Sequence, residues 1–258
     1  MSAPPASPAP SEAAVAAIEA VFAALDWRTL GRVYCDHGGD AFWEDRRRPA
    51  IDLGLRWARE AGRRLRRGGT SVYAGAGVAE LPVMIHEALD LGRTVLAANL
   101  RERECAVLDR ALAACGLPLR VVHGDARTIE APRDHVALVS VLSDPETWPT
   151  LSGLGYGRLH PALVEPARLQ REQEEARALV AGLLDRLTLP GLVTTTVEEV
   201  PWVLAWADAR GVDARADDTM VDTAIVGDPI GFLRLRRAPS DASERAPRAR
   251  RTRRGRRE

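Results

Sequence analysis

Two glycines that follow a short β-prone segment are the residues of this chain with the clearest chemical potential. Residues 70–74 are rich in β-branched and aromatic side chains, Gly75 and Gly77 come next, and an apolar helical pattern begins at Val83. Glycine lets the backbone approach a ligand because it carries no Cβ atom, and a helix N-terminus offers free N–H groups. The spacing therefore predicts a ligand-binding turn between a strand and a helix.

Polar side chains follow the next two predicted strands. Asn99 closes the apolar segment 94–98, and Asp125 follows the segment 119–122, one strand–helix unit further along the chain. The carboxyl ends of parallel strands meet at one edge of an open sheet, and ligands bind there near the switch in strand order. We therefore expect the glycine turn, Asn99 and Asp125 to line one cleft.

Alternating strand and helix patterns supply the elements that position these residues. The segment 136–142 is an unbroken apolar run, which is typical of a central parallel strand buried on both faces. The fold class is thus α/β, with one mostly parallel sheet, an antiparallel C-terminal hairpin and an N-terminal helical cap. The other predicted elements are strands at 70–74, 94–98, 119–122 and 192–197, helices at 78–91, 101–115, 166–187 and 199–210, irregular structure at 144–165, and a hairpin of 222–226 with 232–235.

Composition divides the chain into four parts. Residues 1–10 are an Ala/Pro/Ser leader that we expect to be disordered, residues 11–69 form the helical cap, and the sheet domain spans 70–237. Residues 238–258 hold eight arginines, from Arg245 to Arg257, and three acidic residues, so this segment carries a net charge of +5 in a neutral chain. A disordered basic tail is predicted, capable of weak contact with nucleic acid or an acidic partner.

Missing residue types exclude several activities. The 258 residues include no lysine, so a phosphate-binding P-loop, a pyridoxal-phosphate Schiff base and a protein-kinase site are impossible. Three cysteines do not make a disulfide framework, no apolar run is long enough to cross a membrane, and the N-terminal residues lack the pattern of a secretory signal. We expect a cytoplasmic protein without a membrane association.

Three segments together resemble the class I (Rossmann-like) S-adenosylmethionine-dependent methyltransferases. The resemblance covers roughly residues 51–237 and is carried by 72–77, 95–99 and 123–126. It implies a seven-stranded Rossmann-like sheet, S-adenosyl-L-methionine as the cofactor, and no metal ion. The cofactor-binding positions that it implies are Tyr73, Gly75, Gly77, Asn99, Leu100, Asp125 and Ala126.

The resemblance also implies a role for each strand end. Gly75 and Gly77 would face the amino-acid and ribose parts of the cofactor. Asn99 stands where the family usually has an acidic residue that binds the ribose hydroxyls. Asp125 would accept a hydrogen bond from the adenine amino group, with Ala126 beside the ring.

Several positions depart from the family pattern and narrow the chemistry. Ala79 replaces the third glycine of the turn, Tyr73 replaces the acid that often ends the first strand, and Asn99 is a weaker acceptor than a carboxylate. Residues 142–146 lack the Asn/Asp-Pro-Pro-aromatic motif of nucleobase amino-methyltransferases, and no cysteine follows a proline, as a cytosine-carbon methylase would require. What remains is transfer to O, N or S of a small molecule or a protein group, or a member that has lost catalysis.

Transfer to oxygen usually needs a base near the acceptor, and three side chains are candidates. Asp144 and His160 come after the fourth predicted strand, and His37 lies in the helical cap. Each also has a plain structural interpretation, because Asp144 precedes a proline as turn and N-cap residues do, and both histidines lie in predicted loops.

Two other functions fit parts of the sequence. An NADP-dependent oxidoreductase would use Arg101 and Arg103 for the 2′-phosphate, but the turn lacks the last glycine of Gly-x-Gly-x-x-Gly and Glu80 would stand near the pyrophosphate. A non-catalytic scaffold would keep the fold and use the arginine-rich tail to contact RNA, DNA or an acidic protein.

Overall fold

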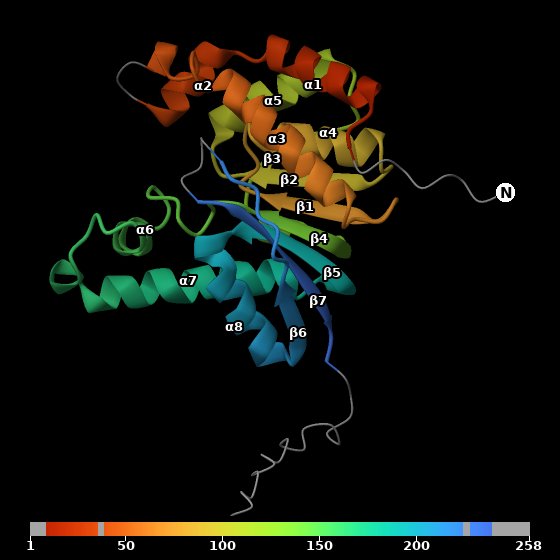
Figure 1. Ribbon diagram of the computed structural model, residues 1–258. Helices are drawn as coiled ribbons and strands as arrows, with labels where there is room; N and C mark the ends of the chain where they lie inside the picture. The colour runs from red at the N-terminus through yellow and green to blue at the C-terminus, as the bar shows by residue number, and fades with distance from the viewer. Residues whose placement is uncertain (1–8, 36–38, 224–227, 239–258) are drawn as a thin grey trace, which may run out of the picture.

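Seven strands form one sheet in the part of the chain that the computed structural model describes, residues 9–35, 39–223 and 228–238 (Figure 1). The strand order is β3-β2-β1-β4-β5-β7-β6. The first five strands run parallel, and β7 is antiparallel to both of its neighbours. The predicted fold class is therefore confirmed. The strands are β1 (Thr70–Ala74), β2 (Thr94–Asn99), β3 (Val121–His123), β4 (Arg133–Leu138), β5 (Leu187–Thr196), β6 (Val212–Ala216) and β7 (Ile230–Arg237).

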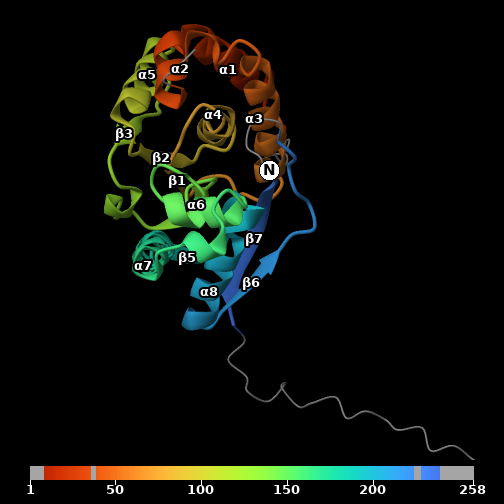
Figure 2. The same cartoon turned by 90° about the vertical axis from the view of Figure 1, so that its left-hand side faces the viewer.

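Helices cover both faces of this sheet (Figures 1 and 2). Helices α3, α4 and α5 lie on one face with α1 and α2 outside them, while α7 and α8 lie on the other, and α6 packs against α7. No helix among the described residues has both the length and the apolar character needed to cross a bilayer. The helices are α1 (Glu12–Ala24), α2 (Trp27–Tyr34), α3 (Arg47–Gly62), α4 (Leu81–Leu89), α5 (Glu102–Ala114), α6 (Pro149–Gly155), α7 (Pro166–Leu184) and α8 (Val200–Arg210).

Alternate strand residues build two hydrophobic cores, one under each helix layer. Tyr73 and Ala137 belong to the core under α3, α4 and α5, whereas their neighbours Val72 and Val136 belong to the core under α7 and α8. This alternation is why the central strands are apolar on both faces. The first core continues into α1 through Ile18, so the predicted helical cap packs against the sheet domain through shared apolar side chains.

The register of the central strands brings their carboxyl ends to one edge. Ala74 of β1 is paired with Ala98 of β2 on one side and with Leu138 of β4 on the other. Asn99 of β2 is paired with His123 of β3. Strand order reverses between β1 and β4, so this edge contains the switch point at which open α/β sheets bind ligands.

Two predicted elements need correction. The sixth strand is β6, directly after Gly211, and not the segment 222–226, of which residues 224–226 lie outside the described part. Because β6 alternates small and charged residues on an exposed hairpin, its pattern carries little apolar signal, and pairing with β7 determines its structure. The segment 144–165 is not wholly irregular, because Pro149 begins α6 and Pro161 begins a short 3₁₀ turn.

Candidate functional site

Three of the predicted site residues lie along one edge of the sheet. Gly75 follows β1, Asn99 ends β2, and Asp125 comes two residues after β3. Since β2 lies between β1 and β3, the glycine turn and Asp125 are two strands apart on the same edge. The edge also holds residues that the sequence did not indicate, and they determine its chemistry.

The glycine turn is held by backbone bonds and by one carboxylate. Gly75 has a φ of 70°, and its N–H donates to the Ala98 carbonyl at 2.8 Å. The N–H of Gly77 donates to Glu80 Oε2 at 2.9 Å. A Cβ atom on Gly77 would lie 2.9 Å from Glu104 Oε1 and 3.2 Å from the Tyr34 hydroxyl, so side chains already surround this glycine.

Two buried carboxyl groups, Glu80 and Glu104, therefore line the turn. Burial raises the pKa of Glu80 to about 7. Burial also raises the pKa of Glu104, against the opposing hydrogen bond from Tyr34 and the positive charge of Arg101. Sequence reasoning noted Glu80 only as an obstacle to a pyrophosphate, and it missed Glu104, whose one signal is its place in the first turn of the helix after Asn99.

Both polar side-chain atoms of Asn99 form hydrogen bonds near the turn. Its Nδ2 donates to the Ala76 carbonyl at 2.9 Å and to Glu104 Oε2 at 3.1 Å, and its Oδ1 accepts from the Arg101 N–H at 2.9 Å. The predicted ribose acceptor is thus engaged within the protein, and Glu104 is the carboxylate at this strand end. Leu100, the next residue, is 60% exposed and offers an apolar surface.

Asp125 is present at the third strand end but is paired with its neighbour Arg127. Its carboxylate accepts from Arg127 Nε at 2.7 Å and from the Arg127 N–H at 2.8 Å. The hydrogen bond from the Arg127 side chain holds the pKa of Asp125 below its ordinary value, so this group is an ionised acceptor at neutral pH. Ala126 beside it is buried.

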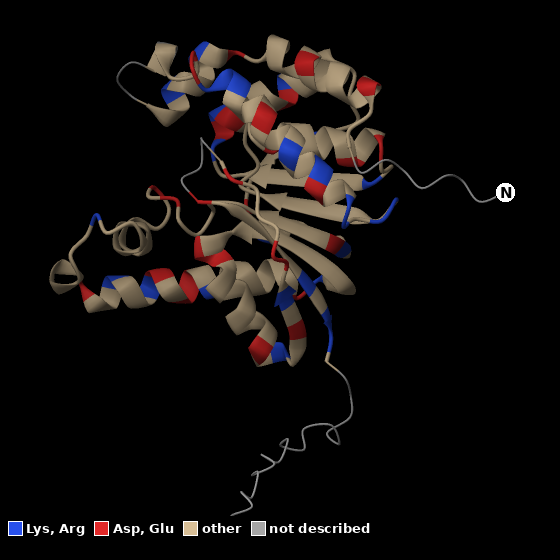
Figure 3. Ribbon diagram, viewed as in Figure 1, with Lys and Arg blue, Asp and Glu red and all other residues tan. Residues whose placement is uncertain are grey.

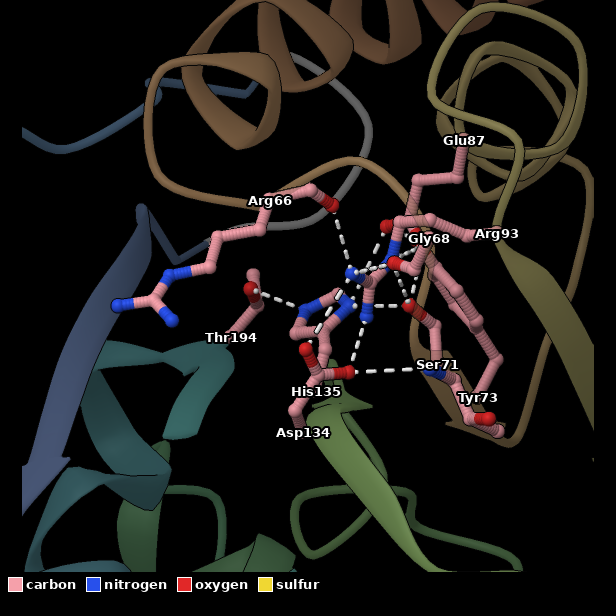
Figure 4. A network of polar contacts seen from close by, with 10 residues as sticks. Arg66, Gly68, Ser71, Tyr73, Glu87, Arg93, Asp134, His135 and Thr194 are labelled. Carbon is pink, nitrogen blue, oxygen red and sulfur yellow. Dashed lines mark hydrogen bonds and ion pairs between the residues drawn. The ribbon is translucent and has the colours of Figure 1, made fainter. Parts of the chain in front are cut away.

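Tyr73 points away from the turn into a buried polar network (Figure 4). Its hydroxyl donates to Glu87 Oε1 of α4 at 2.6 Å. Glu87 also binds the Ser71 hydroxyl and forms ion pairs with Arg93 Nε at 3.3 Å and His135 Nδ1 at 3.2 Å. These five side chains are buried, so Tyr73 joins α4 to β1 and β4 and does not line the turn.

The candidate bases have separate surroundings. Asp144 accepts from Arg101 Nη2 at 3.1 Å and from the Thr147 hydroxyl at 2.7 Å, so an ion pair connects it to the end of β2. His160 is exposed, and its Nδ1 accepts from the Ala162 N–H at 3.2 Å as the cap of a short turn. His37 lies outside the described residues.

The β4–α6 loop (residues 139–148) covers the switch point. Ser140 in this loop has a left-handed φ of 56°, which is unusual for a residue other than glycine and marks a sharp turn after β4. Glu199 Oε1 accepts from the Leu142 N–H at 2.6 Å, and Trp148 Nε1 donates to the Val141 carbonyl at 2.8 Å. Acidic residues of this loop and of the start of α5 lie on the same side of the sheet (Figure 3).

Two cavities in the described part of the chain lie elsewhere. One of about 560 Å³ lies between α3 and residues 220–223, and one of about 360 Å³ lies beside α6. Neither is lined by the glycines of the turn. The approach to Gly77 is instead lined by the side chains of Glu104, Tyr34 and Glu80.

The donor set suits an adenosyl cofactor with a positive charge. Asp125 offers an ionised carboxylate, Glu80 and Glu104 offer carboxyl groups whose ionised form a nearby cation would favour, and Leu100 and Ala126 offer apolar contact. A pyrophosphate placed on the same turn would face buried carboxyl groups. These residues fit the cofactor in charge and hydrogen-bonding capacity, with Glu104 in place of Asn99.

The strand order, with six strands in one direction and β7 antiparallel to them, is that of the class I methyltransferase fold. No family model matches the chain, and a comparison with curated proteins gives no match. Solved structures with a similar fold include magnesium protoporphyrin IX methyltransferase from Synechocystis PCC 6803 with bound SAM, at 17% identity and a TM-score of 0.48, covering 83% of this chain and 99% of that one.

A second similar structure is TrmN from Thermus thermophilus, at 20% identity and a TM-score of 0.45. The match covers 71% of this chain, and the chain spans about half of TrmN, 47% of its length. Because these TM-scores are below 0.5, the fold assignment rests on the order and direction of the strands.

Proposed function

We propose that this chain is an S-adenosylmethionine-dependent methyltransferase that binds its cofactor at the glycine turn and acts on a small molecule or a protein group. The supporting observation is the pair of buried carboxyl groups around Gly77, with Glu104 Oε1 2.9 Å and Glu80 Oε2 3.5 Å from the position of a Cβ atom. A carboxylate in a region of low dielectric favours a nearby positive charge strongly. The sulfonium cofactor carries that charge.

When bound, S-adenosylmethionine would supply an electrophilic methyl group for a nucleophilic atom of the acceptor. The chain supplies the surroundings of that step. The backbone at Gly75 and Gly77 leaves room for the ligand, Glu104 accepts from a hydroxyl group, and Asp125 accepts from the adenine amine. Asp144 and His160 remain the predicted bases for an acceptor proton, and Asp144 is connected to the site through Arg101.

The same carboxyl groups argue against the dinucleotide alternative. The phosphates of NADP would lie against Glu80 and Glu104, where like charges repel and burial strengthens the repulsion. Arg101, the predicted partner of a 2′-phosphate, forms ion pairs with Asp144 and Glu146 at 3.1 and 3.0 Å. A 2′-phosphate would have to compete with both carboxylates.

Calorimetry of the purified full chain tests the proposal. We expect S-adenosylmethionine and its demethylated product to bind, NADPH not to bind, and Asp125→Ala to abolish binding while the protein stays folded by circular dichroism. Asp109→Ala is the matched control, because Asp109 also pairs with an arginine, Arg120, on the surface. Binding of NADPH alone, or wild-type affinity in Asp125→Ala, would count against the assignment.

A non-catalytic scaffold is the second candidate, and the closed turn favours it. Each polar side-chain atom of Asn99 already has a hydrogen-bond partner within the protein, and the Tyr34 hydroxyl binds Glu104. The basic segment 245–257, which lies outside the described residues, would then contact nucleic acid or an acidic partner. Binding of an RNA or DNA oligonucleotide that falls steeply with salt and vanishes on deleting residues 240–258, with no cofactor affinity, would support this function.

A further inference from the structure

The residue that covers the glycine turn from the helical side is Tyr34, the last residue of α2. Its hydroxyl donates to Glu104 Oε1. The Tyr34 hydroxyl oxygen lies 3.2 Å from the position of a Cβ atom on Gly77. The residue is 38% exposed, yet burial of the hydroxyl and the charge of Glu104 raise the pKa of Tyr34 well above its ordinary value. One edge of the ring therefore faces solvent while its polar end reaches the turn.

Tyr34 uses the acceptor that a ligand hydroxyl would need. Glu104 Oε2 accepts from Asn99, so Oε1 is the oxygen that faces the turn. A phenol and a ribose hydroxyl are the same kind of donor, and they cannot occupy the same position on one carboxylate oxygen. A ligand hydroxyl that takes this position on Oε1 must therefore displace the Tyr34 hydroxyl.

The ring of Tyr34 is held by aromatic contacts that belong to the helical layer. It stacks on Phe42 with centroids 5.6 Å apart and planes 6° apart, and its centroid lies 5.4 Å from that of Trp43. The Arg101 guanidinium lies 5.6 Å from the ring centroid. None of these contacts is a strand pairing, so Tyr34 can leave Glu104 without a change in the sheet.

We propose that Tyr34 is a displaceable substitute for a cofactor hydroxyl on Glu104, which keeps the glycine turn covered until an adenosyl ligand replaces it. This role rests on the proposed cofactor site. It makes Glu104 the residue that binds the ligand hydroxyl, and it makes α2 an element that moves on binding. The affinity of the chain for its cofactor is then reduced by the free energy of the Tyr34–Glu104 contact.

Three variants and one control test this role by calorimetry with S-adenosylmethionine and with its demethylated product. Tyr34→Phe keeps the ring and removes the competing hydroxyl, so binding should become tighter by about fivefold or more, as expected for a hydrogen bond to a charged group. Glu104→Gln should weaken binding, and the double variant should show no gain over Glu104→Gln. Tyr156→Phe is the matched control, because it removes a tyrosine–carboxylate hydrogen bond to Asp228 elsewhere, and its affinity should equal that of the wild type.

Hydrogen–deuterium exchange of residues 27–34 gives a readout that does not depend on a cofactor. We expect faster exchange of this helix in Tyr34→Phe than in Tyr156→Phe, and faster exchange in the wild type when S-adenosylmethionine is added. If the wild type binds S-adenosylmethionine and Tyr34→Phe shows the same affinity and the same exchange rate as the wild type, the role of Tyr34 is overturned and the proposed function stays intact. Faster exchange without binding by any variant would overturn the cofactor site and, with it, the role of Tyr34 as a substitute.

Discussion

Val141 lies against Gly75 at the switch point of the sheet, where a Cβ atom on Gly75 would be 2.9 Å from Val141 Cγ2. The two residues follow β1 and β4, the adjacent strands between which the order of the sheet reverses. The place where this fold binds ligands is therefore covered by the loop that follows β4. The contacts that hold this loop in place therefore determine how readily a ligand reaches the switch point.

Arg101 is the side chain that ties the loop to the end of β2, and its removal should speed ligand entry. It is 29% exposed and pairs with both Asp144 and Glu146. Exposed ion pairs contribute about 0.2–1 kcal/mol each, so Arg101→Gln should raise the association rate of S-adenosylmethionine by ~2- to 10-fold and change stability little. Stopped-flow tryptophan fluorescence measures this rate.

The control for this rate is Arg120→Gln, which breaks the exposed pair with Asp109 on the same helix layer. Added salt should accelerate entry in the wild type and in Arg120→Gln, because it screens the Arg101 pairs, but not in Arg101→Gln. Equal salt dependence in all three proteins would show that Arg101 does not restrain the loop.

Gly77 offers a direct test of the space at the turn. Because no left-handed φ is found there, alanine is compatible with its backbone, but the added methyl group would lie 2.9 Å from Glu104 and 3.2 Å from Tyr34. Gly77→Ala should therefore weaken S-adenosylmethionine binding by more than about tenfold, the effect of ~1.4 kcal/mol. Gly155→Ala is the control, since no atom lies within 4 Å of its Cβ position. Equal affinities in calorimetry would place the ligand away from the turn.

The parallel sheet and the residues at the carboxyl ends of its strands could be predicted because their signals are local. The apolar run at 136–142 indicated a strand buried on both faces, and β4 is such a strand, although it spans Arg133–Leu138 and residues 139–142 belong to the loop after it. Gly75 marked a turn, and its φ there is positive. Asn99 and Asp125 were expected at strand ends and lie there. Each of these inferences needed only the spacing of apolar residues along the chain and the type of one residue.

The partners of these residues could not be predicted, because they depend on long-range packing. Tyr34 meets Glu104 across 70 positions of sequence, and Arg101 meets Asp144 across 43. Arg101 was interpreted as a possible phosphate ligand because a sequence shows a charge without its partner. The strand β6 was missed for a related reason, since its pairing with β7 outweighs a weak local pattern.

Glu199 should make the protein less stable as the pH rises. Burial raises its pKa from 4.5 to about 7, so between these values the folded state keeps a proton that the unfolded state releases. The contribution of Glu199 to the free energy of unfolding is therefore largest below pH 4.5 and decreases as the pH rises toward 7. Above pH 7 it is lower by up to about 3 kcal/mol. Urea midpoints at pH 5 and pH 8 measure this difference in the free energy of unfolding.

Glu199→Gln should flatten the pH dependence, because the glutamine does not titrate. Glu198→Gln is the neighbouring control, since Glu198 is exposed, and its profile should match the wild type. Glu80, with a pKa also raised to about 7, should keep part of the slope in both variants. An unchanged slope in Glu199→Gln would mean that Glu199 is ionised throughout this range.

Glu87 should be the most costly acidic residue to remove, although it lies away from the glycine turn. Its buried carboxylate faces Arg93 and His135, and its interactions with them outweigh the effect of burial and lower the pKa of Glu87 (Figure 4). Glu87→Ala removes the buried carboxylate between these groups and leaves Arg93 paired with Asp134, and breaking a buried pair typically costs ~3–5 kcal/mol of unfolding free energy. Urea unfolding at pH 7 measures the loss, which should shrink as the pH falls below about 4.5, where the advantage of the ionised group disappears.

The control is Glu174→Ala, which removes an exposed carboxylate that binds Gln170 on the surface of α7 and should cost less than about 1 kcal/mol. At temperatures where Glu87→Ala stays folded, its S-adenosylmethionine affinity should equal that of the wild type, because Glu87 binds the side chains of Ser71 and Tyr73 within β1 and not the residues of the turn. A variant that unfolds like the wild type would show that Arg93 and His135 find other partners, such as Asp134, which already accepts from Arg93.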